Sequence, residues 1–199
     1  MQSLFSTYFE LGFTHILDPR AYDHLLFLVA LALPFTFGQW RAVVLLATAF
    51  TVGHSLTLAL VGLGWLVLPT AWVEFSIPLT IALTAAYQLW QSRLRAGPPR
   101  RVSPLTYLLV VGFGLVHGAG FSTLFRAMAL PGEDGQLWRQ LLAFNLGVEA
   151  GQVLIVLGIL LASTAALALL RLPYRPWNWL VGGAVFLLSL LLLIESYPR

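Results

Sequence analysis

The sequence contains no cysteine and no lysine, and it has few charged residues of any kind. Charged side chains make up 10% of the 199 residues, whereas 59% of the residues are hydrophobic. An average soluble domain has about 25% charged residues, so this chain has too little polar surface to cover a water-soluble globule. The absence of cysteine excludes disulfides, thiolate metal sites and thiol catalysis. The chain is therefore predicted to be an integral membrane protein, and soluble enzyme folds are excluded.

Long apolar runs separated by Pro, Gly and Arg predict membrane-spanning helices. The runs are continuous, whereas the strands of a membrane β-barrel alternate between apolar and polar residues. We therefore expect an all-α, polytopic membrane bundle in one domain, with about six transmembrane helices preceded by a short outer helix over about 4–17. The seven tryptophans all fall near predicted span ends, where the headgroup layer favours them. The predicted spans are 22–39, 41–68, 72–90, 104–130, 137–170 and 177–194.

The arginines are concentrated in one set of the predicted loops. The opposite set has fewer arginines and most of the carboxylates. The positive-inside rule places the arginine-rich loops in the cytoplasm, so a bacterial-type inner (plasma) membrane protein with both termini outside is expected. A net charge of +3 that rests on so few charges beside apolar spans does not favour nucleic-acid binding. The arginines assigned to the inside are Arg41, Arg93, Arg95, Arg100, Arg101, Arg171 and Arg175.

All four histidines lie in or beside predicted spans, where a polar group costs about 2.5–3.5 kcal/mol on insertion scales and needs a reason. A rise of about 1.5 Å per helical residue puts three of them roughly 20–24 Å above the cytoplasmic face. Glu149 falls in the same layer, and Asp23 precedes one of the histidines. Imidazole and carboxylate suit zinc, nickel or cobalt, so a divalent transition-metal site is predicted in the outer half of the membrane. The candidate ligands are His15, Asp23, His24, His54, His117 and Glu149.

Each of these residues also has an ordinary interpretation. A single buried histidine is often neutral and hydrogen-bonded to a neighbouring helix. His15 precedes the first span, so it could serve as a ligand or shield the outer mouth of the site. Thr51 and Ser55 flank His54 along the chain, and Glu149 lies on a polar stripe of the fifth span. Such residues either hold ligands from an outer shell or join helices together.

Five sequence blocks resemble the HupE/UreJ family of membrane proteins. They are GFTHIL at 12–17, YDHLLFL at 22–28, FTVGHSLTL at 50–58, FGLVHGAGF at 113–121 and FNLGVEAGQ at 144–152. The resemblance implies a small polytopic protein associated with nickel or cobalt uptake, with the six candidate ligands as its metal set. Better-studied members carry a His-x5-Asp-His signature in the first span. Here the interval between His15 and Asp23 is longer, which is typical of a less characterised branch.

Two classes of function follow. The first is a divalent metal permease that captures a cation from outside and releases it inside. The second is a membrane-embedded zinc hydrolase that attacks a lipid amide or ester from the outer leaflet, with metal-bound water as nucleophile. In the hydrolase, Asp23 or Glu149 would be the general base and Ser55 would orient the substrate. The resemblance favours transport. A metal sensor and a homo-oligomer stay open, and the expected partners are membrane lipid and a metal ion.

Overall fold

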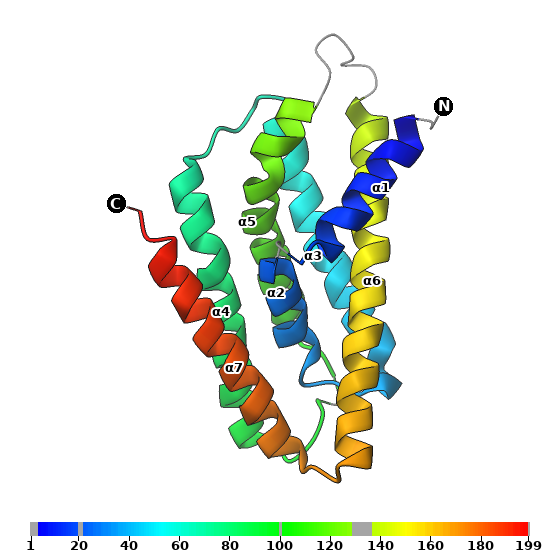
Figure 1. Ribbon diagram of the computed structural model, residues 1–199, viewed down its shortest axis with the longest axis vertical. Coiled ribbons are helices and arrows are strands. Elements are labelled where there is room, and N and C mark those ends of the chain that lie inside the picture. Colours follow the sequence, from blue (N-terminus) through cyan, green and yellow to red (C-terminus); the bar gives the residue numbers. More distant parts are fainter. Residues whose placement is uncertain (1–3, 20–21, 100, 129–136, 199) are drawn as a thin grey trace.

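The computed structural model describes residues 4–19, 22–99, 101–128 and 137–198, with side chains for these ranges except 122–128. Regular structure in the described part of the chain is entirely helical (Figure 1). The elements are α1 (Leu4–Leu17), α2 (Tyr22–Ala32), a short 3₁₀ helix η1 (Phe37–Gln39), α3 (Trp40–Gly62), α4 (Thr70–Leu94), α5 (Pro104–Met128), α6 (Leu137–Leu169) and α7 (Tyr174–Glu195).

Four segments of the described chain are long and apolar enough to cross a membrane. They are Phe37–Gly62, Pro104–Phe121, Leu137–Leu169 and Tyr174–Glu195. The helical membrane character of the chain is thus confirmed, but the predicted count of about six spans is not. Tyr22–Ala32 is apolar and short, at 11 residues, and α4 has polar residues distributed along its 25 residues.

Two predicted spans extend beyond the helices that the structure contains. Within 22–39, α2 ends at Ala32, because Pro34 disfavours helical geometry at the residue before it. Within 41–68, α3 ends at Gly62, because Gly64 adopts a positive φ of 73°. The N–H groups of Gly64 and Trp65 then bond the carbonyls of Val61 and Leu60 at 3.0 and 2.9 Å, which is the Schellman pattern of helix termination.

The other predicted bounds differ from the helices by a few residues. The short outer helix expected over 4–17 coincides with α1, and the span expected over 72–90 lies within α4. The spans expected over 137–170 and 177–194 correspond to α6 and α7. The last two residues of the span expected over 104–130 lie outside the described residues.

The helices associate as three closely packed pairs, α3 with α5, α1 with α6, and α4 with α7, and α2 contacts members of all three (Figure 1). Glycines set the tightest approach. A Cβ added to Gly118 of α5 would lie 2.9 Å from the Cα of His54 on α3, and one added to Gly147 of α6 would lie 2.8 Å from the backbone nitrogen of Phe13 on α1. This close packing fixes the backbones that bear the histidines.

Candidate metal centre

The interruption between α1 and α2 lies beside the candidate site. His15 is in the last turn of α1, and Asp23 and His24 are in the first turn of α2. Neither helix is long enough to cross a membrane alone. In Figure 1 the two helices meet part-way along the bundle, between the ends of the longer helices. A helix interruption of this kind is where several transporter folds bind their substrates.

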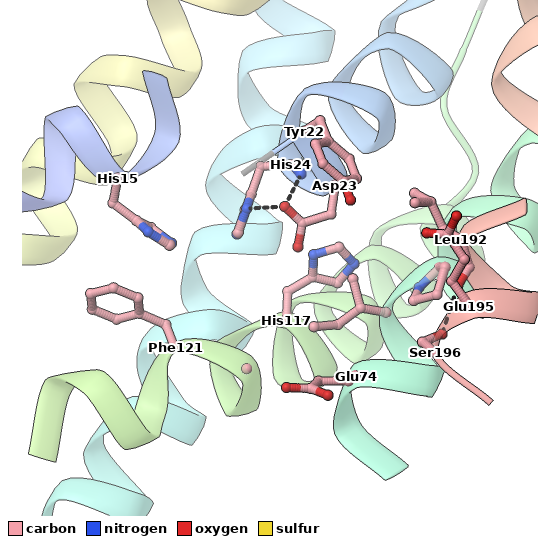
Figure 2. Close-up of a pocket in the computed structure, with 13 residues that line it drawn as sticks. His15, Tyr22, Asp23, His24, Glu74, His117, Phe121, Leu192, Glu195 and Ser196 are labelled. Atoms are coloured by element: carbon pink, nitrogen blue, oxygen red, sulfur yellow. Dashed lines mark hydrogen bonds and ion pairs between the residues drawn. The ribbon is translucent and has the colours of Figure 1, made fainter. Parts of the chain in front are cut away.

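Three histidines from three helices come together at this interruption. His15, His24 and His54 each offer one ring nitrogen, and the three nitrogens lie within 4.8 Å of one another. His54 is fully buried and His24 is 5% exposed. Figure 2 shows His15 and His24 reaching toward the same space from different helices. Three converging imidazoles are a common ligand set for a transition metal.

Asp23 fixes the orientation of His24. One oxygen of its carboxylate, Oδ1, accepts a hydrogen bond from the backbone N–H of His24 at 2.9 Å and lies 3.0 Å from Nδ1 of the same histidine (Figure 2). Because the carboxylate accepts, Nδ1 carries the proton and Nε2 of His24 keeps its lone pair. A metal-binding histidine almost always donates its other ring N–H to a carboxylate, a backbone carbonyl or a water, and the Asp23 carboxylate is such a partner.

His117 is positioned by Thr80 of α4. The Thr80 hydroxyl lies 2.7 Å from the carbonyl oxygen of Ile77, to which it can only donate, and 3.0 Å from Nε2 of His117. With its one proton so used, the hydroxyl accepts from Nε2–H, and Nδ1 of His117 keeps a lone pair. The ring centroid of His117 lies 5.5 Å from that of His24, and Figure 2 shows His117 beneath Asp23.

The unpartnered nitrogens test whether these residues fit a metal. Buried polar atoms are nearly always hydrogen-bonded, and leaving one without a partner costs about 1–3 kcal/mol. Here His15 and His24 each leave Nε2 buried without a partner, His54 leaves both ring nitrogens, and His117 leaves Nδ1. Ordinary helix-to-helix hydrogen bonding does not account for such a group. A cation held by several of these lone pairs would satisfy them, so the residues fit a transition metal.

Glu149 lies in a different group of polar side chains. Its carboxylate accepts hydrogen bonds from the Thr48 hydroxyl at 2.5 Å and the Thr51 hydroxyl at 2.7 Å, both on α3. Thr51 also lies 3.0 Å from the side-chain oxygen of Gln152. The structure therefore does not bring Glu149 into the group formed by His15, His24 and His54. It places Glu149 against the flank of α3.

The Ser55 hydroxyl bonds the backbone of its own helix and not the histidine group. It donates to the backbone carbonyl of Thr51 at 2.6 Å, one turn earlier on the same helix. This back-bond is the usual arrangement for a serine inside a helix. The hydroxyl is thus already engaged within α3.

An acidic cavity leads to the histidines. It has a volume of about 540 Å³ and is lined by residues of α2, α4, α5 and α7 together with His15 of α1. Its carboxylates are Asp23, Glu74 and Glu195, and none of the lining side chains that the structure describes is an arginine (Figure 2). A cavity lined by charge of one sign raises the local concentration of the opposite ion, so this one attracts cations.

The side of the site away from this cavity is closed by aromatic rings. Phe27 and Phe50 are buried, and their ring centroids lie 5.4 and 5.1 Å from that of His117. Phe50 also stacks near His54, at 6.1 Å between centroids. The histidines therefore lie between the acidic cavity and the rings of Phe27 and Phe50, which together are called the aromatic floor of the site.

Sequence reasoning missed Thr80 and gave Glu74 no role in the site. Thr80 and Thr84 form a polar stripe one turn apart on α4, and this stripe was the available signal. Both residues lie on α4, whose rotation about its own axis the sequence leaves open.

The comparison with protein families is decisive for the class of this chain. The HupE / UreJ protein model matches residues 1–195. The chain belongs to the HupE/UreJ family. The five blocks that resemble this family thus lie within the match, and four of them carry the histidines of this HupE/UreJ protein, of which His15, His24 and His117 line the cavity. A search of curated proteins and a search of solved structures each gave no match.

Proposed function

We propose that this HupE/UreJ protein is a permease for a divalent transition metal of the nickel or cobalt type. One observation carries the proposal: two buried imidazoles, His24 and His54, and the half-buried imidazole of His15 bring unpartnered nitrogens from three helices within 4.8 Å of one another at the end of an acidic cavity. The association of the family with nickel and cobalt uptake supports the same function. The metal is the substrate, and the histidines are its binding site in the membrane.

Capture of the ion follows from the charges along the cavity. Glu74 and Glu195 stand in the cavity wall together with Asp23. A hydrated divalent cation enters this acidic space and exchanges water for imidazole nitrogen. His15, His24 and His54 form the first ligand group, with His117 beside them. Oriented by the excess of arginine at the opposite end of the bundle, this cavity opens toward the outside of the membrane.

Release of the ion requires the aromatic floor to move. Phe27 belongs to α2 and Phe50 to α3, and their ring centroids lie 4.8 Å apart. No hydrated ion passes such a contact, so transport needs α2 to shift relative to α3. The break between α1 and α2 leaves α2 joined to α1 by a short connection, which suits such a displacement. A zinc hydrolase would need no opening of this floor, but the family match gives that alternative no support.

The experiment is metal uptake by the purified chain in sealed vesicles that contain a nickel-sensitive dye. We expect uptake by the natural sequence and loss of at least nine-tenths of it in His54→Ala and His24→Ala. Thr84→Val is the matched control, because the Thr84 hydroxyl bonds only the backbone carbonyl of Thr80 among the bonds described. Nickel binding without uptake by the natural sequence would contradict the permease.

A further inference from the structure

A cluster of arginines lies at the end of the bundle opposite the acidic cavity. Arg93 is in the last turn of α4, Arg95 follows as the first residue after that helix, and Arg175 is the second residue of α7. Because α4 and α7 pack side by side, these three residues share one corner of the protein (Figure 1). All three side chains are exposed.

The corner holds its positive charges in place and offers them no carboxylate partner. Nε of Arg175 donates to the backbone carbonyl of Arg95 at 3.1 Å, which brings two cations together. The sequence has no Asp or Glu between Glu74 and Glu133, nor between Glu149 and Glu195. Neither helix end therefore supplies a carboxylate. The compensating negative charge must come from outside the chain.

The helix dipole explains only part of this arrangement. Cations near the end of α4 are favoured, because the C-terminus of a helix is its negative end. Arg175 is in the first turn of α7, where the dipole is positive and disfavours a cation. The dipole of α7 therefore does not account for Arg175, whereas an anion outside the chain would stabilise it together with Arg93 and Arg95.

Apolar side chains beside the arginines indicate which kind of anion. The guanidinium of Arg93 lies over the Trp179 ring, 4.8 Å from its centroid. Trp90 and Leu94 lie within one turn of Arg93 on α4, Leu180 follows Trp179 on α7, and their exposed fractions are 56%, 64% and 67%. Tryptophan prefers the boundary between headgroups and acyl chains. A phosphate at this boundary, attached to acyl chains that cover the leucines, is that of a lipid.

We propose that the corner formed by Arg93, Arg95 and Arg175 binds the phosphate of an anionic phospholipid, whose acyl chains cover the exposed side chains between α4 and α7. This site is independent of the metal centre. An arginine near an anionic membrane surface contributes about 1 kcal/mol, which is about fivefold in binding. Three arginines give a preference on the order of a hundredfold for an anionic over a zwitterionic lipid.

The test is native mass spectrometry of the full chain, titrated in detergent with phosphatidylglycerol or phosphatidylcholine. We expect the natural sequence to prefer phosphatidylglycerol on the order of a hundredfold, and Arg93→Gln/Arg95→Gln/Arg175→Gln to lose that preference. Arg41→Gln is the matched control, because Arg41 also lies over a tryptophan at this end but outside the corner. Equal binding of the two lipids, an unchanged preference in the triple variant, or an equal loss in the control would overturn the proposal.

Two further measurements keep the test decisive if the triple variant does not fold. Arg93→Gln alone removes a side chain whose described contact is with the exposed Trp179, and it should weaken phosphatidylglycerol binding about fivefold. For the natural sequence, phosphatidylglycerol binding should fall as salt is raised from about 0.05 to 0.5 M, because added salt shortens the Debye length and screens the arginine charges. Salt-independent binding, or competition by inorganic phosphate at the same concentration as the lipid, would contradict a lipid site.

Discussion

Replacement of Gly118 by alanine should weaken metal binding without altering any candidate ligand. Gly118 lies where α5 crosses α3. An added Cβ would contact the carbonyl oxygen of His54 and lie 2.9 Å from its Cα and 3.0 Å from its carbonyl carbon. Ordinary carbon contacts are about 3.5–4.0 Å, so the two backbones must separate by roughly half an ångström. Backbone atoms cannot rotate away as a side chain can.

The expected magnitudes follow from this displacement. Overpacking of a tight interface costs typically 1–3 kcal/mol, and each kilocalorie lowers the melting temperature of a chain of this size by about 2–4 °C. Ligands must be held within about 0.5 Å of the productive geometry, and His54 is carried on the displaced backbone. We therefore expect nickel affinity to fall tenfold or more. Isothermal titration well below the melting temperature measures the affinity separately from stability.

Gly112→Ala provides the matched control. Gly112 lies on the same helix, and a Cβ built there meets nothing within 4 Å. The control should melt near the natural protein and bind nickel with unchanged affinity. If Gly118→Ala binds nickel as tightly as Gly112→Ala, the inferred coupling between the α3–α5 contact and the site is wrong.

Three further predictions concern individual side chains. Thr80→Val should lower nickel affinity about 10–100-fold, because Nε2 of His117 loses its hydrogen-bond partner. Thr84→Val should leave the affinity unchanged. Equal effects of the two substitutions on nickel binding would refute the role of Thr80. Glu149→Gln should change nickel affinity less than about threefold, because Glu149 bonds Thr48 and Thr51 rather than the histidine group. A loss of affinity comparable to that in His54→Ala would show that Glu149 is a metal ligand. The double variant Glu74→Gln/Glu195→Gln should slow nickel association about tenfold at low salt and much less at high salt. Stopped-flow mixing measures this association rate. An association rate that does not depend on these carboxylates would exclude electrostatic capture in the cavity.

The convergence of histidines could be expected from sequence because depth in a helical bundle is set by the rise per residue. His24 and His54 are at matching depth by that measure, and the structure brings them together. His15 was harder to place, because its position depends on the packing of α1 against α6. The close approach of backbones at Gly12 and Gly147 sets that packing, and glycine spacing alone does not specify which helices meet.

The depth of a residue along its helix does not predict which direction its side chain faces, because that direction depends on the rotation of the helix about its own axis. Depth along the helix put Glu149 in the layer of the histidines, yet its carboxylate bonds the hydroxyls of Thr48 and Thr51. Thr80 was overlooked for the converse reason, since the polar stripe that it forms with Thr84 does not indicate which neighbouring helix Thr80 faces. These orientations come from how the described helices pack together.

Helix ends were predicted to within a few residues where the sequence changes from apolar to polar, and they were missed where apolar residues continue beyond the end of the helix. Residues 63–68 are mostly apolar, so they were assigned to a span, although Gly64 and Pro69 are typical of a helix end. Local backbone chemistry decided the end of α3 against the apolar pattern. The same reasoning applies to Pro34, which follows closely after the end of α2.

The measurement that tests the central claim most directly is the nickel content of the purified chain after equilibrium dialysis, beside His54→Ala. His54 is fully buried, and both of its ring nitrogens lack a partner. If the histidine group holds the metal, the natural sequence should retain about one nickel ion per chain and the folded variant close to none. Equal nickel in the two proteins, or none in the natural sequence, would contradict a histidine metal centre.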